Sequence, residues 1–157
     1  MKRSTSLLIG GAALLVTGVV LMPLTSATAD SGPKRVRLEL TETSTAFHFI
    51  DAPAAEADGQ AGDLITFESD LSRTGTSAGS LEGHCVQIRA DGTLDDCDVT
   101  VTIGADSYRM SGPFDPATGG TLTITGGTGN WVGASGTDTI TNQPDGTAIH
   151  AILLVRR

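Results

Sequence analysis

Alternating apolar and polar residues run through most of the chain after residue 34, in short segments separated by turn-forming residues. Over 35–41, Val36, Leu38 and Leu40 interleave with charged residues and Thr41, which is the period of two expected for a strand with one buried face. Further strands are predicted over 45–50, 63–69, 107–114, 121–125, 131–141 and 147–157. Together with the hairpin described next, these eight or nine strands predict an all-β domain, either a closed antiparallel barrel or a sandwich.

The segment 81–103 predicts a β-hairpin. If Cys85 pairs with Cys97, facing residue numbers sum to 182, and 90–92 is left as a three-residue loop with Gly92 where a left-handed conformation is required. The apolar face then holds Leu81, Gly83, Cys85, Cys97, Val99 and Val101. Loop chemistry, face pattern and a disulfide bond therefore favour one register, with two buried free thiols as the alternative.

The three histidines show no metal-ligand spacing. In the last segment, Ile149 and its apolar neighbours alternate with His150, which predicts that His150 faces solvent, as do His48 and His84 on their strands. A zinc site needs three or four converging ligands, so we expect no metal and no cofactor. The acidic residues Asp95, Asp96 and Asp98, close to the hairpin tip, predict a solvated edge, with a calcium site as the weaker alternative.

Residues 1–29 have the features of a secretory signal peptide. Lys2 and Arg3 precede an uncharged apolar stretch over 7–24, and Ala27-Thr28-Ala29 offers a small-x-small site, which predicts cleavage after Ala29 and secretion. An uncleaved membrane anchor is the alternative, because the stretch is about long enough to span a bilayer. With cleavage, we expect an extracellular protein without stable membrane association, composed of an N-terminal arm and first strand (30–44) and a barrel domain (45–157).

The net charge argues against nucleic acids and anionic membranes as partners. It is −8 for the whole chain and −10 once Lys2 and Arg3 are removed. Nucleic-acid binding depends on clustered basic side chains, and anionic membranes attract the same groups. The sequence therefore predicts neither partner.

Three stretches, taken in order, carry a family resemblance. They are 62–67 (GDLITF) with Leu71, 83–86 (GHCV) after Gly79, and a block from 111–114 (SGPF) to 124–136 (ITGGTGNWVGASG). The last block contains Gly126, Gly127, Thr128, Gly129 and Gly133 around Trp131. Together they resemble the allene oxide cyclase barrel family and its relatives, the dirigent proteins, over residues 45–141. The resemblance implies a closed antiparallel eight-stranded barrel.

The resemblance also implies a function for the lumen. Plant allene oxide cyclases guide ring closure of a fatty-acid epoxide inside the barrel, and dirigent proteins orient phenoxy radicals. By strand parity, the candidate lumen residues are Leu81, Val99, Val101, Tyr108, Met110, Phe114 and Trp131. Because the plant relatives are trimeric, a homo-oligomer is a further expectation.

The chain departs from the family at several positions. Ser69 stands where the cyclases have a water-binding Asn, Phe114 stands where they have Tyr, and Cys85 matches the family cysteine. Asp51 is the candidate for the family's acidic residue on an early strand, with turn capping as its alternative role. The sequence thus predicts a barrel that binds a small hydrophobic molecule and steers its cyclisation or coupling, an isomerase-like activity. A non-catalytic extracellular interaction or scaffold domain is the alternative, and a lumen filled with side chains would favour it.

Overall fold

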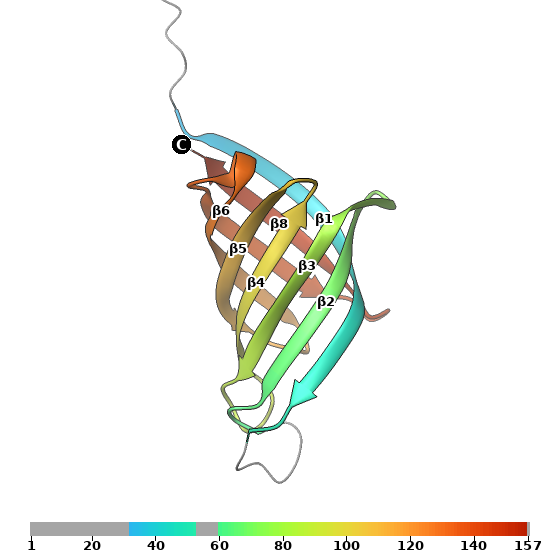
Figure 1. Ribbon diagram of the computed structural model, residues 1–157. Coiled ribbons are helices and arrows are strands. Elements are labelled where there is room, and N and C mark those ends of the chain that lie inside the picture. The colour runs from blue at the N-terminus through green and yellow to red at the C-terminus, as the bar shows by residue number, and fades with distance from the viewer. Residues whose placement is uncertain (1–31, 53–59, 157) are drawn as a thin grey trace, which may run out of the picture. The chain divides into compact units, whose positions relative to one another are not determined.

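The computed structural model describes residues 32–52 and 60–156, which form a closed antiparallel barrel of eight strands in chain order (Figure 1). The strands are β1 (Lys34–Ile50), β2 (Leu64–Arg73), β3 (Thr76–Gln87), β4 (Asp95–Ile103), β5 (Asp106–Phe114), β6 (Gly119–Gly127), β7 (Ser135–Asn142) and β8 (Thr147–Arg156). Pairing of β1 with β8 closes the barrel. The predicted closed eight-stranded barrel is confirmed. The predicted leader lies outside the described residues, and no helix within those residues is long and apolar enough to cross a membrane.

Strand β1 is continuous where the sequence predicted two extended runs. A register shift between Ser44 and Ala46 places an extra residue in β1 against β2. Such a bulge changes which residues face the interior. Glu42 lines the interior before the bulge, and Phe47 and Phe49 line it afterwards. The inward positions therefore change from even to odd numbers at the bulge, which is why the sequence pattern over 35–50 indicated two strands instead of one.

The inward and outward faces of strand β8 are the reverse of those predicted. His150 is 1% exposed and faces the interior, as do Ile152 and Leu154, so the expectation of a solvated His150 is wrong. Apolar residues occupy both faces of β8, so the alternation does not indicate which face points to the interior. The other two histidines, His48 and His84, are exposed as predicted.

The β3–β4 hairpin has the predicted register. Cys85 faces Cys97, and the two form a disulfide bond with their Cα atoms 4.0 Å apart. Gly92 has the predicted left-handed conformation, with φ of 68°. The connection spans 88–94 rather than 90–92, because two amides of the loop donate to a carbonyl oxygen inside the loop instead of extending the ladder.

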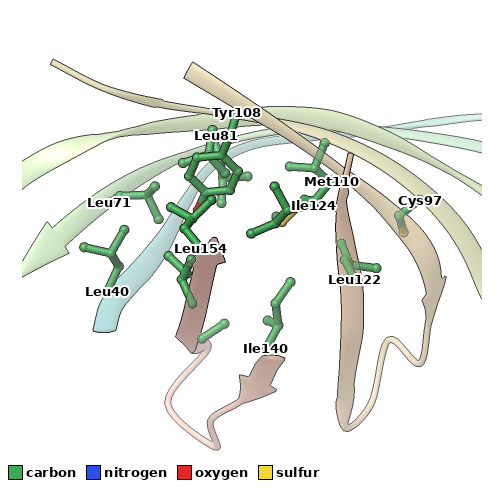
Figure 2. Packing of buried hydrophobic residues seen from close by; sticks show 14 of the residues in the cluster. Leu40, Leu71, Leu81, Cys97, Tyr108, Met110, Leu122, Ile124, Ile140 and Leu154 are labelled. Carbon is green, nitrogen blue, oxygen red and sulfur yellow. The ribbon is translucent and has the colours of Figure 1, made fainter. Parts of the chain in front are cut away.

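Buried hydrophobic side chains converge from several strands in the barrel interior (Figure 2), and those that do not line the cavity described below fill one half of it. Its fully buried members include Leu40, Leu71, Val101, Tyr108, Ile124 and Leu154. The ring of Trp131 meets that of Tyr108 edge to face, with centroids 6.5 Å apart. Trp131 belongs to the short 3-10 helix η1 (Gly129–Trp131), so β7 begins at Ser135, later than the predicted strand over 131–141. This half of the barrel forms the apolar core.

The glycine-rich family motif builds the turn at this filled end, where the C-terminus also lies (Figure 1). A Cβ on Gly127 would meet the Ser107 carbonyl oxygen at 2.5 Å and the Trp131 Cβ at 2.6 Å, so this position requires glycine. The Asp106 carboxylate accepts hydrogen bonds from the backbone amide of Asn130 at 3.1 Å and from its side-chain amide at 2.7 Å. These contacts give the motif a structural role. None of its members, Gly126, Gly127, Thr128, Gly129 and Gly133, lines the cavity described below.

Candidate functional site

A cavity of about 690 Å³ occupies the other half of the barrel interior. Its walls are mainly apolar: Phe47, Phe49, Ile65, Phe67, Leu81, Val99, Met110, Phe114, Leu122, Ile140, Ala148 and the disulfide of Cys85 with Cys97 line it. Of the predicted lumen residues, Leu81, Val99, Met110 and Phe114 thus lie on the cavity wall. Val101 and Tyr108 are buried in the filled half, and Trp131 packs against that half. The barrel therefore encloses space for a small apolar molecule on one side of a solid core.

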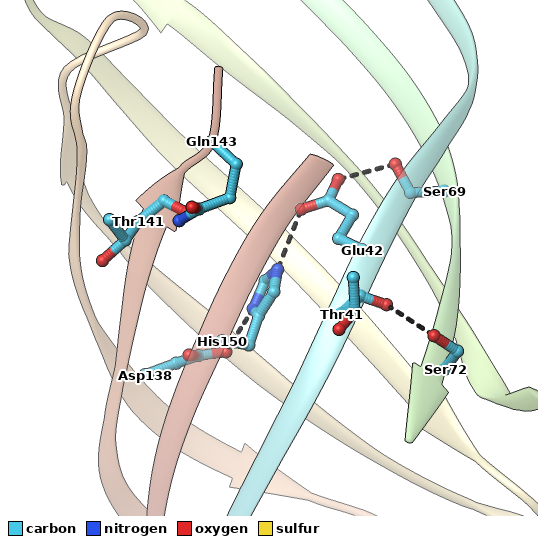
Figure 3. A network of polar contacts seen from close by, with 8 residues as sticks. All are labelled: Thr41, Glu42, Ser69, Ser72, Asp138, Thr141, Gln143 and His150. Atoms are coloured by element: carbon cyan, nitrogen blue, oxygen red, sulfur yellow. Dashed lines mark hydrogen bonds and ion pairs between the residues drawn. The ribbon is translucent and has the colours of Figure 1, made fainter. Parts of the chain in front are cut away.

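A chain of polar side chains crosses four consecutive strands at the bottom of this cavity (Figure 3). His150 Nδ1 lies 2.9 Å from Asp138 Oδ2, and His150 Nε2 lies 2.8 Å from Glu42 Oε2. The Ser69 hydroxyl donates to Glu42 Oε1 at 2.6 Å. We call these four residues, Asp138, His150, Glu42 and Ser69, the polar network.

The strand register brings the network together. His150 faces Leu40 on β1 and Ile140 on β7. Glu42 lies two residues after Leu40, and Asp138 lies two residues before Ile140. Residues displaced by two share a strand face, and long side chains reach such diagonal neighbours. Ser69 stands in the same diagonal relation to Glu42 across β1 and β2. The pairing of β1 with β8, which closes the barrel, thus joins Glu42 to His150, and the β7–β8 and β1–β2 pairs add Asp138 and Ser69.

The network holds a protonated imidazole between two carboxylates. Burial alone would lower the pKa of His150, but hydrogen bonds to Asp138 and Glu42, together with their negative charges, outweigh it and raise the pKa to about 9. Burial also opposes ionisation of Glu42, yet hydrogen bonds from His150 and Ser69 hold its pKa below the usual value. At neutral pH the network thus places a positively charged imidazolium beside the ionised Glu42.

The members of the network differ in their access to the cavity. Glu42, Ser69 and His150 line it, and the Glu42 side chain is 18% exposed, whereas Asp138 is fully buried. A carboxylate has about four lone-pair sites, so Glu42 can accept a further hydrogen bond from a bound molecule. Its charge also faces any positive charge that develops there. Asp138 contacts only His150 among these groups, so it meets the cavity only through the imidazolium ring.

Asp51, the predicted acid, lies elsewhere. It is exposed and is not among the described residues that line the cavity, so Glu42 on β1 takes its place as the candidate carboxylate of the site. Glu42 has the same strand parity as Leu38 and Leu40, so the alternation along 36–42 already indicates an inward side chain at this position. Ser69, matched to the family's water-binding Asn, does lie in the site. No local signal marks Asp138.

The acidic residues at the hairpin also differ from the prediction. Asp96 and Asp98 are exposed as expected, but Asp95 is 3% exposed and lines the cavity, so its assignment to a solvated edge is wrong. As the first residue of β4, Asp95 has the inward parity of Cys97 and Val99. Within residues 32–52 and 60–156, no group of three or more His, Cys, Asp and Glu side chains could hold a metal ion.

Solved structures share this barrel, although no family model and no curated protein matches the chain. A pyocyanin demethylase superposes with a TM-score of 0.64 at 22% identity, over 74% of this chain and 99% of that one. A pterocarpan synthase dirigent protein has a TM-score of 0.64 at 12% identity, over 80% and 86%. The Diels Alderase AbmU from Streptomyces koyangensis has a TM-score of 0.61 at 16% identity, over 82% and 70%. At these identities the comparisons establish the fold, and this chain has the barrel fold of dirigent proteins and cyclases that the sequence motifs resemble.

Proposed function

We propose that this protein binds one small, mainly apolar molecule in the barrel cavity and steers its cyclisation or coupling. The observation that carries the proposal is the cavity of about 690 Å³ with a charged network at its bottom. Pockets for small molecules have volumes of this order and combine apolar walls with few polar groups. Dirigent proteins and a Diels Alderase share the barrel, which supports the reaction class. We further propose that the protein acts outside the cell after removal of residues 1–29.

The proposed chemistry is mainly conformational. Rigid strands hold the walls, so a flexible molecule inside is restricted to few shapes, and water is kept from its reacting atoms. Glu42 accepts a hydrogen bond from the bound molecule or stabilises positive charge that develops during ring closure. His150 keeps Glu42 ionised, and Asp138 keeps the imidazolium in place. This division of roles predicts that, within the polar network, only Glu42 needs to contact the reacting molecule.

The alternative, a non-catalytic scaffold domain, would be favoured by an interior filled with side chains. Here the filled half ends at the polar network, and the rest is open. The exposed Phe47 and Phe49, whose rings meet edge to face at 4.9 Å, also line the cavity. Their exposure therefore supports an apolar entrance to the cavity rather than a separate docking surface.

A matched pair of variants tests whether molecules bind in the cavity. Leu122 and Thr123 are neighbours on β6, but only Leu122 lines the cavity, while Thr123 is exposed. A panel of phenolics, polyenes and fatty acids would be screened by thermal shift and native mass spectrometry. We expect Leu122→Trp to weaken binding of any hit at least tenfold, and Thr123→Trp to leave it unchanged. Equal affinity in both variants would place the ligand outside the lumen, and the absence of hits from every apolar class would favour the scaffold alternative.

Catalysis needs a separate test with a substrate found in that screen. Glu42→Gln keeps the size of the side chain and removes its charge, so we expect kcat to fall at least tenfold with KM changed less than threefold. Glu39→Gln on the exposed face of the same strand is the control. A Glu42→Gln enzyme with unchanged kcat would exclude Glu42 from the reaction.

A further inference from the structure

The cavity holds a second buried carboxyl group, remote from the polar network in the strand order. Asp95 lies on β4 and faces Gln87 on β3 and Phe114 on β5, and all three line the cavity. Asp95 Oδ1 is buried and has no hydrogen-bond partner. Burial, and secondarily the negative charge of Asp115, raises the pKa of this carboxyl. Asp95 therefore carries an unmet hydrogen-bonding requirement beside the proposed ligand.

The cavity has no free positive charge to satisfy that requirement. None of the described lining residues is Lys or Arg. Among the described residues that line the cavity, only His150 carries positive charge, and it is already bonded to both Glu42 and Asp138. Leaving a buried polar group unpaired is costly, and leaving a buried charge unpaired is more so. No described side chain completes Asp95, and we infer that its partner comes from solvent or from the bound molecule.

We propose that the ligand is a neutral or cationic apolar molecule that presents a hydroxyl or amine donor to Asp95, and that the cavity rejects carboxylates and phosphates. This inference rests on the proposed function and specifies its substrate class. Negative charge on Glu42 and on Asp95 would repel an anionic ligand, and no Lys or Arg among the described lining residues would compensate. A donor group at Asp95 would gain a hydrogen bond that no side chain supplies.

Three probes of equal size and different charge test the proposal: 9-(aminomethyl)anthracene, 9-anthracenemethanol and anthracene-9-carboxylate. Their fluorescence allows binding to be titrated directly at neutral pH. For the wild-type protein we expect the amine to bind at least as tightly as the alcohol, and the carboxylate to bind at least tenfold more weakly than the alcohol. Because the aromatic part is shared, this order reports the charge and the hydrogen-bond donors of the substituent.

Asp95→Asn identifies the residue responsible, with Asp98→Asn on the exposed face of β4 as the matched control. In Asp95→Asn we expect amine binding to weaken at least tenfold, alcohol binding to change less than threefold, and carboxylate binding to improve. Asp98→Asn should leave all three affinities unchanged. Near-ultraviolet circular dichroism of each variant checks that the barrel is intact, and the wild-type order of probes tests the proposal without any variant.

Two results would overturn the inference, and they are distinguishable from failure of the proposed function. If the carboxylate binds as tightly as the amine, or if Asp95→Asn preserves the selectivity, the charge argument is wrong while alcohol binding still supports a ligand-binding lumen. If the alcohol does not bind, or if Leu122→Trp binds it as tightly as the wild type, the lumen is not a binding site for these molecules and both proposals fail.

Discussion

The polar network predicts that barrel stability falls as pH rises from neutral to alkaline. The pKa of His150 is raised from 6.5 to about 9 in the folded protein. A raised pKa contributes stability that is complete below the unfolded value and is lost as pH rises through the folded value. Each unit corresponds to about 1.4 kcal/mol, so the loss between pH 6.5 and about 9 amounts to roughly 3 kcal/mol. The lowered pKa of Glu42 reflects the same contacts and is not counted again.

Urea denaturation with the disulfide bond intact measures this dependence. We expect the free energy of unfolding to fall by roughly 3 kcal/mol between about pH 6 and pH 9.5, with an unchanged m-value. His150→Gln should be less stable at neutral pH and should lack most of the decline. His48→Gln, on the exposed side of β1, should retain it. A wild-type protein whose stability is flat over this range, or a decline preserved in His150→Gln, would refute the assignment of a protonated buried His150.

Three further predictions concern the frame of the barrel. A Cβ on Gly136 would collide with a backbone carbonyl of β8, so Gly136→Ala should lower the unfolding free energy by about 3 kcal/mol or more. A Cβ on Gly146 would meet no atom within 4 Å, so Gly146→Ala, the control, should cost only about 1 kcal/mol for its positive φ. Replacing both Cys85 and Cys97 by Ser should cost about 3 kcal/mol in urea denaturation, because the bond closes a short loop, and added reductant should then have no further effect. The buried Tyr108 hydroxyl has no hydrogen-bond partner, so Tyr108→Phe should change the unfolding free energy by less than about 1 kcal/mol. A larger loss would indicate a bridging water.

The β3–β4 hairpin shows what local sequence can predict. Its register, disulfide bond and apolar face were specified by residues within 23 positions of one another, over 81–103. Turn chemistry, alternation and the cysteine pair all favoured the same pairing, so an error in one would have been visible in the others. The inward residues Leu81 and Val99 followed directly from that register.

The polar network shows what local sequence could not predict. His150 and Glu42 are 108 positions apart and meet only because β8 pairs with β1. Both faces of β8 carry apolar residues, so the sequence did not indicate which face points inward, and the wrong choice placed His150 in solvent. Asp138 lies in a Thr-rich strand, where an acidic residue normally predicts an exposed face. Strand pairing, rather than propensity, decides these positions: the β7–β8 hairpin brings Asp138 to His150, and barrel closure brings His150 to Glu42.

The positions of the charged groups along the barrel suggest how a ligand would be oriented. Glu42, Ser69 and His150 are the deepest lining residues of their strands, because Leu40, Leu71 and Ile152 one step further belong to the filled core. Asp95 is instead the outermost residue of β4. A molecule that places its donor group at Asp95 would therefore direct its apolar remainder inward, with its far end beside Glu42. The fixed strands would then determine both which end of the ligand enters first and which atoms meet the charged floor of the cavity.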